Sequence, residues 1–124
     1  MREIIFRGKR IDNGEWVEGC LFVDDKGEKH EILVGYVNYR IAWEVNPETV
    51  RQYTGLTDKN GKKIFEGDIV KFGDILFYII FVGGCFRLCR NHQYSYTLHN
   101  LYDALEIIGN IHDNPELLKG GVEE

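Results

Sequence analysis

The 124-residue chain has no apolar stretch long enough to cross a membrane as a helix. Its longest apolar run, Ile75–Val82, has 8 residues, whereas a membrane helix needs about 20. The opening residues also lack the apolar core of a secretory signal. These absences exclude a membrane-spanning helix and lead us to expect a cytoplasmic protein.

Cysteine and proline are scarce, at 3 Cys and 2 Pro. An odd number of cysteines cannot all pair within one chain, so Cys20, Cys85 and Cys89 are expected to be reduced thiols in a cytosol. The chain has no excess of positive charge either. Its net charge is -5, and residues 1–99 carry 14 basic and 14 acidic side chains, so residues 100–124 account for the deficit. Nucleic-acid binding would therefore need a local basic patch.

Aromatic residues and glycine are abundant, at 7 Tyr, 7 Phe, 2 Trp and 14 Gly, a composition typical of strands joined by tight turns. Turn signals at residues 12–14 and 24–27 separate three runs with strand character. These features predict a three-stranded meander over residues 2–10, 15–23 and 30–37. Residues 38–57 are expected to be less regular, with one short helical turn capped by Asn46 and begun by Pro47.

The second half of the chain is expected to hold a small sheet. Gly67-Asp68 opens a strand, and Ile75–Val82 is apolar enough to be a central strand buried on both faces. Residues 85–90 alternate, which points Phe86 and Leu88 inward. Further along we expect, in order, a polar loop over 91–95, a short helix or strand over 102–108, an extended segment over 109–113 and a short helix over 114–120.

The fold class predicted by this pattern is mainly β, either a small SH3-like barrel or curled antiparallel sheets with one or two short helices. We expect a single domain over residues 1–124. Within it, residues 1–44 form the amino-terminal meander and residues 45–118 the SH3-like barrel portion with its short helices. Residues 119–124 are expected to be a frayed tail.

Three segments carry a family resemblance. The first begins Arg2-Glu3-Ile4 and continues through Gly14-Glu15-Trp16-Val17. The second and most specific runs from Val45-Asn46-Pro47 to Gly67-Asp68-Ile69-Val70, and the third from Ile107 to Leu118. In these segments the chain resembles the YopX-like family of phage and prophage proteins. The resemblance implies a self-associating, β-rich accessory protein of a bacterial host cell. The family has no established activity, so no functional residue is transferred.

Cys85, Cys89 and His92 are the only close group of zinc-type ligands. A tetrahedral site would need a fourth ligand from Cys20, His99 or His112. On one strand Cys85 and Cys89 would lie about 13 Å apart, too far to share an ion. We therefore expect cysteines packed beside a core, with no metal and no cofactor.

Glu66 and Asp68 lie two residues apart, on one face of an extended segment. With His112 they form the one acid–base set in the chain that suggests an enzyme or a ligand sensor. The competing interpretation is that the carboxylates cap a turn and that His112 is structural. We favour it and expect no enzymatic activity.

Two short segments are basic, and together they suggest a nucleic-acid or partner contact. The cations of these segments are Arg7, Lys9, Arg10, Lys59, Lys62 and Lys63. The rings of Trp16 and Tyr53 would serve as stacking platforms for bases. The competing interpretation is a set of solvated strand faces balanced by nearby acidic residues.

The leading hypothesis is a non-enzymatic accessory protein that self-associates and binds a host or phage protein through a sheet edge or a barrel groove. The alternative hypothesis is a nucleic-acid-binding module that uses the basic segments.

Overall fold

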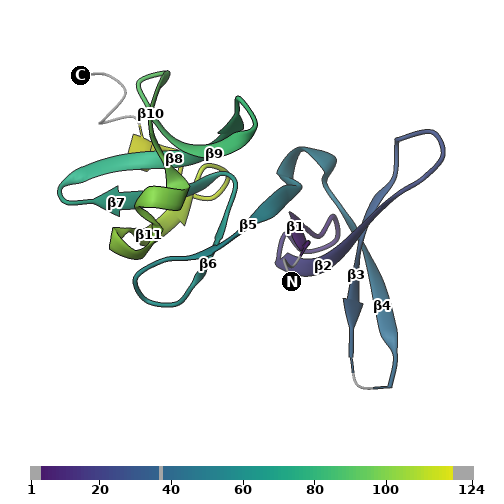
Figure 1. Cartoon of the computed structure of the whole chain (residues 1–124). Coiled ribbons are helices and arrows are strands. Elements are labelled where there is room, and N and C mark those ends of the chain that lie inside the picture. The colour runs from purple at the N-terminus through teal and green to yellow at the C-terminus, as the bar shows by residue number, and fades with distance from the viewer. Residues whose placement is uncertain (1–3, 37, 119–124) are drawn as a thin grey trace. The chain divides into compact units, whose positions relative to one another are not determined.

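The structure, a computed structural model, describes residues 4–36 and 38–118. It is mainly β, with antiparallel strands and three short 3-10 helices, and this confirms the predicted fold class at that level (Figure 1). The described residues do not form a closed barrel. They form two compact units, residues 1–53 (unit 1) and 54–124 (unit 2), each described by itself. The predicted frayed tail, 119–124, lies outside the described residues.

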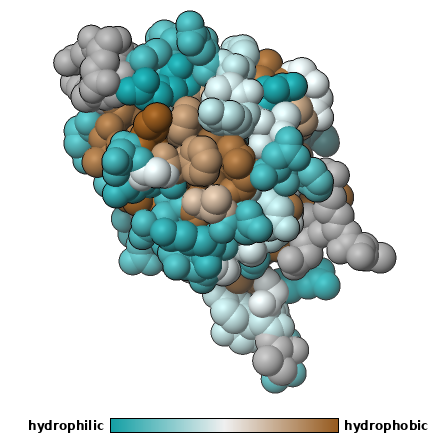
Figure 2. All heavy atoms as spheres, turned by 60° about the vertical axis from the view of Figure 1, so that its left-hand side comes forward, coloured by the Kyte–Doolittle hydropathy of each residue, from teal (hydrophilic) through white to brown (hydrophobic). Residues whose placement is uncertain are grey.

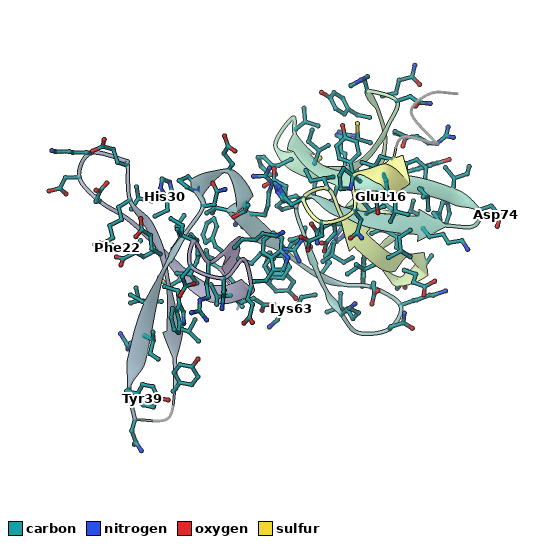
Figure 3. All side chains as sticks on the ribbon, turned by 180° about the vertical axis from the view of Figure 1, so that it is seen from behind. Phe22, His30, Tyr39, Lys63, Asp74 and Glu116 are labelled. Carbon is teal, nitrogen blue, oxygen red and sulfur yellow. The ribbon has the colours of Figure 1, made fainter. Side chains whose placement is uncertain are left out.

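Unit 1 contains the predicted meander. Its strands are β1 (Phe6–Lys9), β2 (Trp16–Val23), β3 (His30–Gly35), β4 (Arg40–Val45) and the start of β5 (Arg51–Thr57). They pair in the order β4-β3-β2-β1-β5. The predicted turn after β1 is present: Gly14 has a φ of 75° and donates its backbone N–H to the carbonyl of Arg10 at 2.9 Å. Figure 3 shows Tyr39 at the tip of the hairpin that joins β3 and β4.

The prediction that residues 38–57 are less regular was wrong for most of this segment. It contains β4, β5 and the 3-10 helix η1 (Pro47–Thr49), of which only η1, with Asn46 as its cap, was expected. The sequence of β4 places Ile41, Trp43 and Val45 on one face, a strand signal that the prediction missed. Its register with β3, Ile32 opposite Trp43 and His30 opposite Val45, supplies the pairing.

The buried part of unit 1 is small. Ile32 and Val45 are fully buried, and Tyr53 is 7% exposed. Gly8 of β1 lies so close to Val45 that an added Cβ would meet its side chain at 3.0 Å, which explains a glycine inside that strand.

Unit 2 contains a five-stranded sheet in the order β10-β9-β8-β7-β11. Its strands are β7 (Asp68–Phe72), β8 (Ile75–Val82), β9 (Cys85–Arg90), β10 (Gln93–Thr97) and β11 (Glu106–Asn110). Strand β6 (Lys63–Phe65) pairs with β5, and the 3-10 helices η2 (Leu98–Asn100) and η3 (Tyr102–Ala104) precede β11. Asp74 marks the tip of the β7–β8 hairpin (Figure 3).

One face of this sheet carries the core of unit 2. The core is a cluster of buried side chains from β6 to β11, namely Ile64, Val70, Phe77, Ile79, Leu88, Leu98 and Leu105. The inward orientation of Phe86 and Leu88 is confirmed, as are the bounds of β8. The prediction that β8 is buried on both faces was wrong. Only Phe77 and Ile79, which share one face, are buried, whereas the residues of the other face are half-buried, because this antiparallel sheet packs its core on one face. Phe81, on the same face as Phe77 but near the end of the strand, is 52% exposed.

Two predictions near the end of the chain were also wrong in part. The expected loop over 91–95 is a two-residue turn followed by β10, and the expected extended segment over 109–113 ends with β11 at Asn110 and continues as a turn. A helix begins at residues 116–118, and the remainder of the predicted helix lies outside the described residues.

No helix in the described ranges is long and apolar enough to cross a membrane.

Candidate protein-binding groove beside strand β10

Strand β10 is an end strand of the unit 2 sheet, paired on one side with β9. Its sequence, Gln-Tyr-Ser-Tyr-Thr, contains no charge and no proline, and every residue except Thr97 is exposed. Natural proteins usually protect such edges with charged residues, proline, a bulge or a covering segment. Within residues 4–36 and 38–118, one of these devices is seen at β10, an irregular register with β9.

That irregularity is a β-bulge. Tyr94 lies opposite Cys89 and Thr97 opposite Arg87, so two residues of β10, Ser95 and Tyr96, share the space opposite Leu88. The Ser95 hydroxyl donates to the Leu88 carbonyl at 3.3 Å. A bulge re-aims side chains, and here it turns Tyr96 to the core face of the sheet.

Tyr96 packs on that face against two aromatic rings of the sheet. Its ring lies edge-on to Phe72, with centroids 6.0 Å apart, and to Phe77 at 6.2 Å. Tyr96 nevertheless stays 50% exposed. It therefore forms the wall of a surface groove rather than part of the closed core.

The groove, about 230 Å³ in volume, is defined by two kinds of residue. Its apolar and aromatic lining comes from Ile75, Phe77 and Tyr96, and its polar lining from Arg90, Asn91, Gln93 and Ser95. Figure 2 shows apolar residues gathered on the face that it brings forward, bordered by hydrophilic ones. The volume is below the about 300–1,000 Å³ of typical small-molecule pockets, and it suits one or two side chains of a peptide.

The opposite face of the same strands carries a polar pair, the buried Cys89 and the half-buried Tyr78. Cys89 and Tyr78 lie side by side, with the sulfur 3.2 Å from the phenolic oxygen. The hydrogen bond with Cys89 and the burial of the ring raise the pKa of Tyr78 to about 12. Tyr78 therefore stays neutral at physiological pH and acts as a packing and hydrogen-bonding group.

Two other sheet ends, β11 and β4, are better protected than β10. On β11, the N–H of Ile107 donates to the Asp58 carboxylate at 3.0 Å and that of Asn110 to the Asn114 side chain at 3.2 Å. On β4, Ile11 donates to the carbonyl of Glu44 at 3.0 Å, and Arg40 adds a charge. Among the described residues, strand β10 is thus less protected than the end strands β4 and β11.

The predicted basic residues of unit 1 are arranged around two indole rings. Arg7 and Lys9 lie over Trp16, with the guanidinium carbon 4.7 Å and the ammonium nitrogen 5.5 Å from the ring centroid. Arg7 lies opposite Glu18 in the β1–β2 register. The indole face of Trp16 is therefore already in contact with cations, as in a typical cation–π pair.

Arg10 stacks on the second indole, with its guanidinium carbon 3.6 Å from the Trp43 ring centroid. It also donates two hydrogen bonds to Asp12, at 2.9 and 2.7 Å. This pairing raises the pKa of Arg10 and lowers that of Asp12. Arg10 and Lys9 line an open groove of about 410 Å³ with Ile11, Gly14, Asn46 and Pro47.

The remaining predicted contact residues do not join this cluster within unit 1. Tyr53 is 7% exposed, so its ring is not a stacking platform on the surface. Lys59, Lys62 and Lys63 belong to unit 2, where they lie exposed around the β5–β6 turn. Lys59 is 3.8 Å from the carboxylate of Glu106.

The structure brings the segments of Glu66, Asp68 and His112 together, because the N–H of Ile111 donates to the Gly67 carbonyl at 2.9 Å. Asp68 is 1% exposed, and its carboxylate accepts the N–H of Phe65 at 2.8 Å. The backbone N–H of His112 donates to the Asn110 side chain at 3.0 Å. Asp68 thus caps a turn, as the competing interpretation stated, and His112 belongs to a second turn.

Gly109 shows how tightly that second turn is built. A Cβ at this position would lie 2.5 Å from the side-chain oxygen of Asn114, the same oxygen that accepts the N–H of Asn110. The Gly-Asn-x-His-Asp-Asn segment therefore has a structural explanation in its hydrogen bonds.

All three cysteines carry free thiols. Within residues 4–36 and 38–118 no three His, Cys, Asp or Glu side chains gather in a way that could hold a metal ion.

The groove was missed at the sequence level. The signal available was the uncharged Gln-Tyr-Ser-Tyr-Thr segment, whose aromatic alternation is typical of a strand. Its polarity and the preceding Asn91-His92 favoured a loop instead.

These features together define an antiparallel β protein of two compact units, with an aromatic groove beside an open edge in the second. The sequence profile of the YopX protein family matches residues 5–119, and the chain belongs to this family, as predicted. Among solved structures, the chain is similar to the crystal structure of protein EF1440 from Enterococcus faecalis. The two share 28% sequence identity with a TM-score of 0.60, over 95% of this chain and 99% of that one. No curated protein matches the chain.

Proposed function

We propose that this protein is a non-enzymatic, self-associating protein-binding module, and that the β10 edge and its groove make the contact. We further propose that it acts in the cytoplasm of a bacterial cell as a phage- or prophage-encoded accessory protein, partnering itself and a host or phage protein.

The observation that carries this proposal is the combination of an uncharged end strand with a groove directly beside it. An end strand offers unpaired backbone groups to an extended partner, and pockets beside it give side-chain specificity. Tyr94 and Tyr96 are 54% and 50% exposed, and tyrosine is enriched at protein interfaces. Exposed aromatic side chains on an edge strand are therefore consistent with a partner that covers them.

The strand order of unit 2 adds support. The order β10-β9-β8-β7-β11, with 3-10 helices before the last strand, matches the order of small SH3-like barrels. We propose that unit 2 is an open variant of that fold. Aromatic grooves on domains of this kind bind extended peptides. This is an argument from fold analogy and does not identify a partner.

One variant pair tests the proposal. Tyr94→Lys places a positive charge on the β10 edge, and Tyr39→Lys makes the same change at a comparably exposed tyrosine of unit 1, 59% exposed. We expect Tyr94→Lys to abolish both self-association in light scattering and capture of partner proteins from a nuclease-treated bacterial lysate. Tyr39→Lys should leave both unchanged.

Circular dichroism would confirm that both variants remain folded. If the folded Tyr94→Lys variant assembles and captures proteins as the wild type does, β10 is not the contact. If captured proteins disappear on nuclease treatment, binding is through nucleic acid.

The alternative proposal, a nucleic-acid-binding module, is favoured by the Arg7, Lys9 and Trp16 cluster. Cations and aromatic rings along one strand are the components of single-stranded nucleic-acid sites. The Arg10–Asp12 pair and the Glu18 opposite Arg7 reduce its positive charge. This alternative requires binding that weakens steeply with salt and is lost on charge reversal of Arg7 and Lys9.

A further inference from the structure

We infer that one face of strands β2, β3 and β4 in unit 1 is a docking surface for a basic amphipathic helix of a partner protein. This face, called here the outer face, carries Cys20, Phe22, Glu31, Leu33, Ala42 and Glu44. An apolar side chain of the helix packs at its centre, and a lysine or arginine one turn away meets the two glutamates. The inference goes beyond the proposed function, because this surface belongs to unit 1 and β10 to unit 2.

The centre of the outer face is apolar. Cys20 lies opposite Leu33, and Leu33 opposite Ala42, so these three side chains form one row across the sheet. Phe22, labelled in Figure 3, lies in the next row and is 60% exposed. Cys20 and Ala42 are exposed as well, and Leu33 is half-buried. The solvated face of an antiparallel sheet normally carries polar residues, whereas an exposed apolar patch with a polar rim is typical of an interaction site.

The row that contains Phe22 is acidic. Phe22 lies opposite Glu31, and Glu31 opposite Glu44. Two carboxylates directly opposite each other on neighbouring strands destabilise a sheet. The ammonium nitrogen of Lys29 is 3.8 Å from the Glu31 carboxylate, but the Lys29 side chain is 54% exposed, and an exposed pair of this kind contributes little. A cation supplied by a partner would relieve the repulsion between the two glutamates.

The charges around this row also favour a cationic partner. The β2–β3 turn contains three acidic and two basic residues, namely Asp24, Asp25, Glu28, Lys26 and Lys29. The basic groups of the same sheet face are further away. Arg7 and Lys9 lie over Trp16 at the other end of β2, and Arg40 lies two rows from Glu44. A surface that is acidic at one end attracts and orients a basic segment.

A helix fits this face better than an extended strand does. The face of a sheet presents side chains, so a partner that lies on it must satisfy its own backbone hydrogen bonds, as a helix does. Strands β2 and β4 lie about 10 Å apart, two strand spacings, which matches the diameter of a helix. Adjacent rows of side chains lie about 7 Å apart along the strands, and residues i and i+4 of a helix about 6 Å apart. An apolar residue at i and a lysine at i+4 therefore reach the two rows.

The test uses three capped helical peptides with the full chain. Each is about 15 residues long, because shorter isolated helices are marginal in water. In the first, leucines at i and i+7 and lysines at i+4 and i+11 form one face, and Ala and Gln fill the other positions. The other two peptides carry Gln or Glu in place of Lys. Binding is followed by chemical-shift changes of backbone amides in ¹⁵N-labelled protein.

We expect the Lys peptide to shift the amides of β2, β3 and β4 saturably. The Gln peptide should bind about fivefold more weakly, as loss of exposed ion pairs predicts, and the Glu peptide should give no saturable shift. Added salt should weaken the Lys peptide and leave the Gln peptide unchanged, because it screens exposed charges.

Two glutamates provide a matched pair of variants. Glu44→Gln should weaken the Lys peptide about fivefold and at the same time raise Tm, because it removes the repulsion with Glu31. Glu116→Gln, the same change at an exposed glutamate of unit 2 (Figure 3), should leave binding unchanged. Phe22→Thr keeps a strand-forming residue and should abolish saturable binding, whereas Ile75→Thr, at an exposed isoleucine of unit 2, should retain it.

Equal binding of all three peptides, shifts located outside β2, β3 and β4, or equal effects of Glu44→Gln and Glu116→Gln would each overturn the inference. Shifts of these strands that depend on protein concentration without any peptide would also overturn it, because the occupant would then be a second copy of the chain.

The Tyr94→Lys variant separates this inference from the proposed function. It should bind the Lys peptide as the wild type does, and loss of that binding in the folded variant would place the contact at β10 and overturn the inference. If the inference fails while Tyr94→Lys still abolishes self-association, the proposed function remains supported. If Tyr94→Lys has no effect on self-association and protein capture, the proposed function fails whatever the peptides do.

Discussion

At the scale of single residues, Asp58 connects two segments of unit 2 that are distant in the sequence. One carboxylate oxygen accepts the N–H groups of Asn60 and Lys62, both at 2.9 Å, within the β5–β6 turn. The other accepts the N–H of Ile107 in β11 at 3.0 Å. Asp58 is 4% exposed, so these three bonds replace its hydration.

The pKa of Asp58 follows from this arrangement. Burial of the carboxylate opposes its ionisation, but the hydrogen bonds from Ile107, Lys62 and Asn60 outweigh burial and lower the pKa below its ordinary 3.8. A lowered pKa means that the folded state favours the charged form. The resulting stability is fully present above pH 4 or so and is lost as the pH falls through the lower, folded-state pKa.

We predict that Asp58→Asn lowers the free energy of unfolding by about 1–3 kcal/mol at pH 7, because the amide group cannot accept all three bonds. The difference from the wild type should shrink as the pH falls from about 4 to 2, where the wild-type carboxylate becomes protonated. Urea denaturation across this range would measure it. Asp74→Asn, at the exposed tip of the β7–β8 hairpin (Figure 3), is the control. A constant difference at all pH values would contradict the prediction.

At the scale of elements, the β9–β10 hairpin is closed by a strained two-residue turn. Asn91 and His92 have φ values of 53° and 62°, and they are the two non-glycine residues with positive φ in the described part of the chain. Asparagine and histidine are enriched among non-glycine residues with positive φ, but each carries a Cβ that opposes this conformation, which glycine lacks. The turn starts β10 at Gln93, which lies opposite Arg90.

We predict that His92→Gly stabilises the protein by about 0.5–1 kcal/mol, because Asn-Gly is the preferred sequence for a turn with two positive φ values. Thermal unfolding would show the change as a rise in Tm. His99→Gly, in the 3-10 helix η2, is the control and should lower Tm, since no positive φ is relieved there. A lower Tm for His92→Gly would show that the histidine makes a contact worth more than the strain.

At the scale of the whole molecule, the two units differ in how much apolar surface they bury. Among the described residues, unit 1 buries Ile32, Val45 and Tyr53, whereas unit 2 has a cluster of buried side chains drawn from β6 to β11. Burial of apolar surface is the main stabilising contribution to a fold. Unit 2 should therefore be the more stable of the two.

We predict that backbone amides of β8 and β9 exchange with solvent at least about tenfold more slowly than those of β2 and β3. Local opening needs less free energy where fewer apolar contacts are lost. Hydrogen exchange on the full chain, read by mass spectrometry of peptides from each unit, measures the difference directly. Equal protection in both units would mean that the chain opens as one cooperative whole.

Much of the fold was predictable because its signals are local. Turn residues such as Asn13-Gly14, the cap and proline of η1, and the apolar run of β8 act within a few positions. The strands β4, β5 and β10 were missed. The alternation in β4 and β10 is a local strand signal, but it covers only 6 and 5 residues, and pairing with β3 and β9 determines them. The structural use of Asp68 was anticipated, but the burial of Tyr53 was not.

The sequence by itself thus determined the family, the β class and the positions of the sharp turns, since each depends on residue types at fixed short spacings. Only the tertiary structure decided that Ser95 and Tyr96 share one position opposite Leu88, and so that Tyr96 and Arg90 line a common groove. A bulge is a property of two paired strands. No spacing within one strand encodes it, because the register depends on which residues the neighbouring strand places opposite.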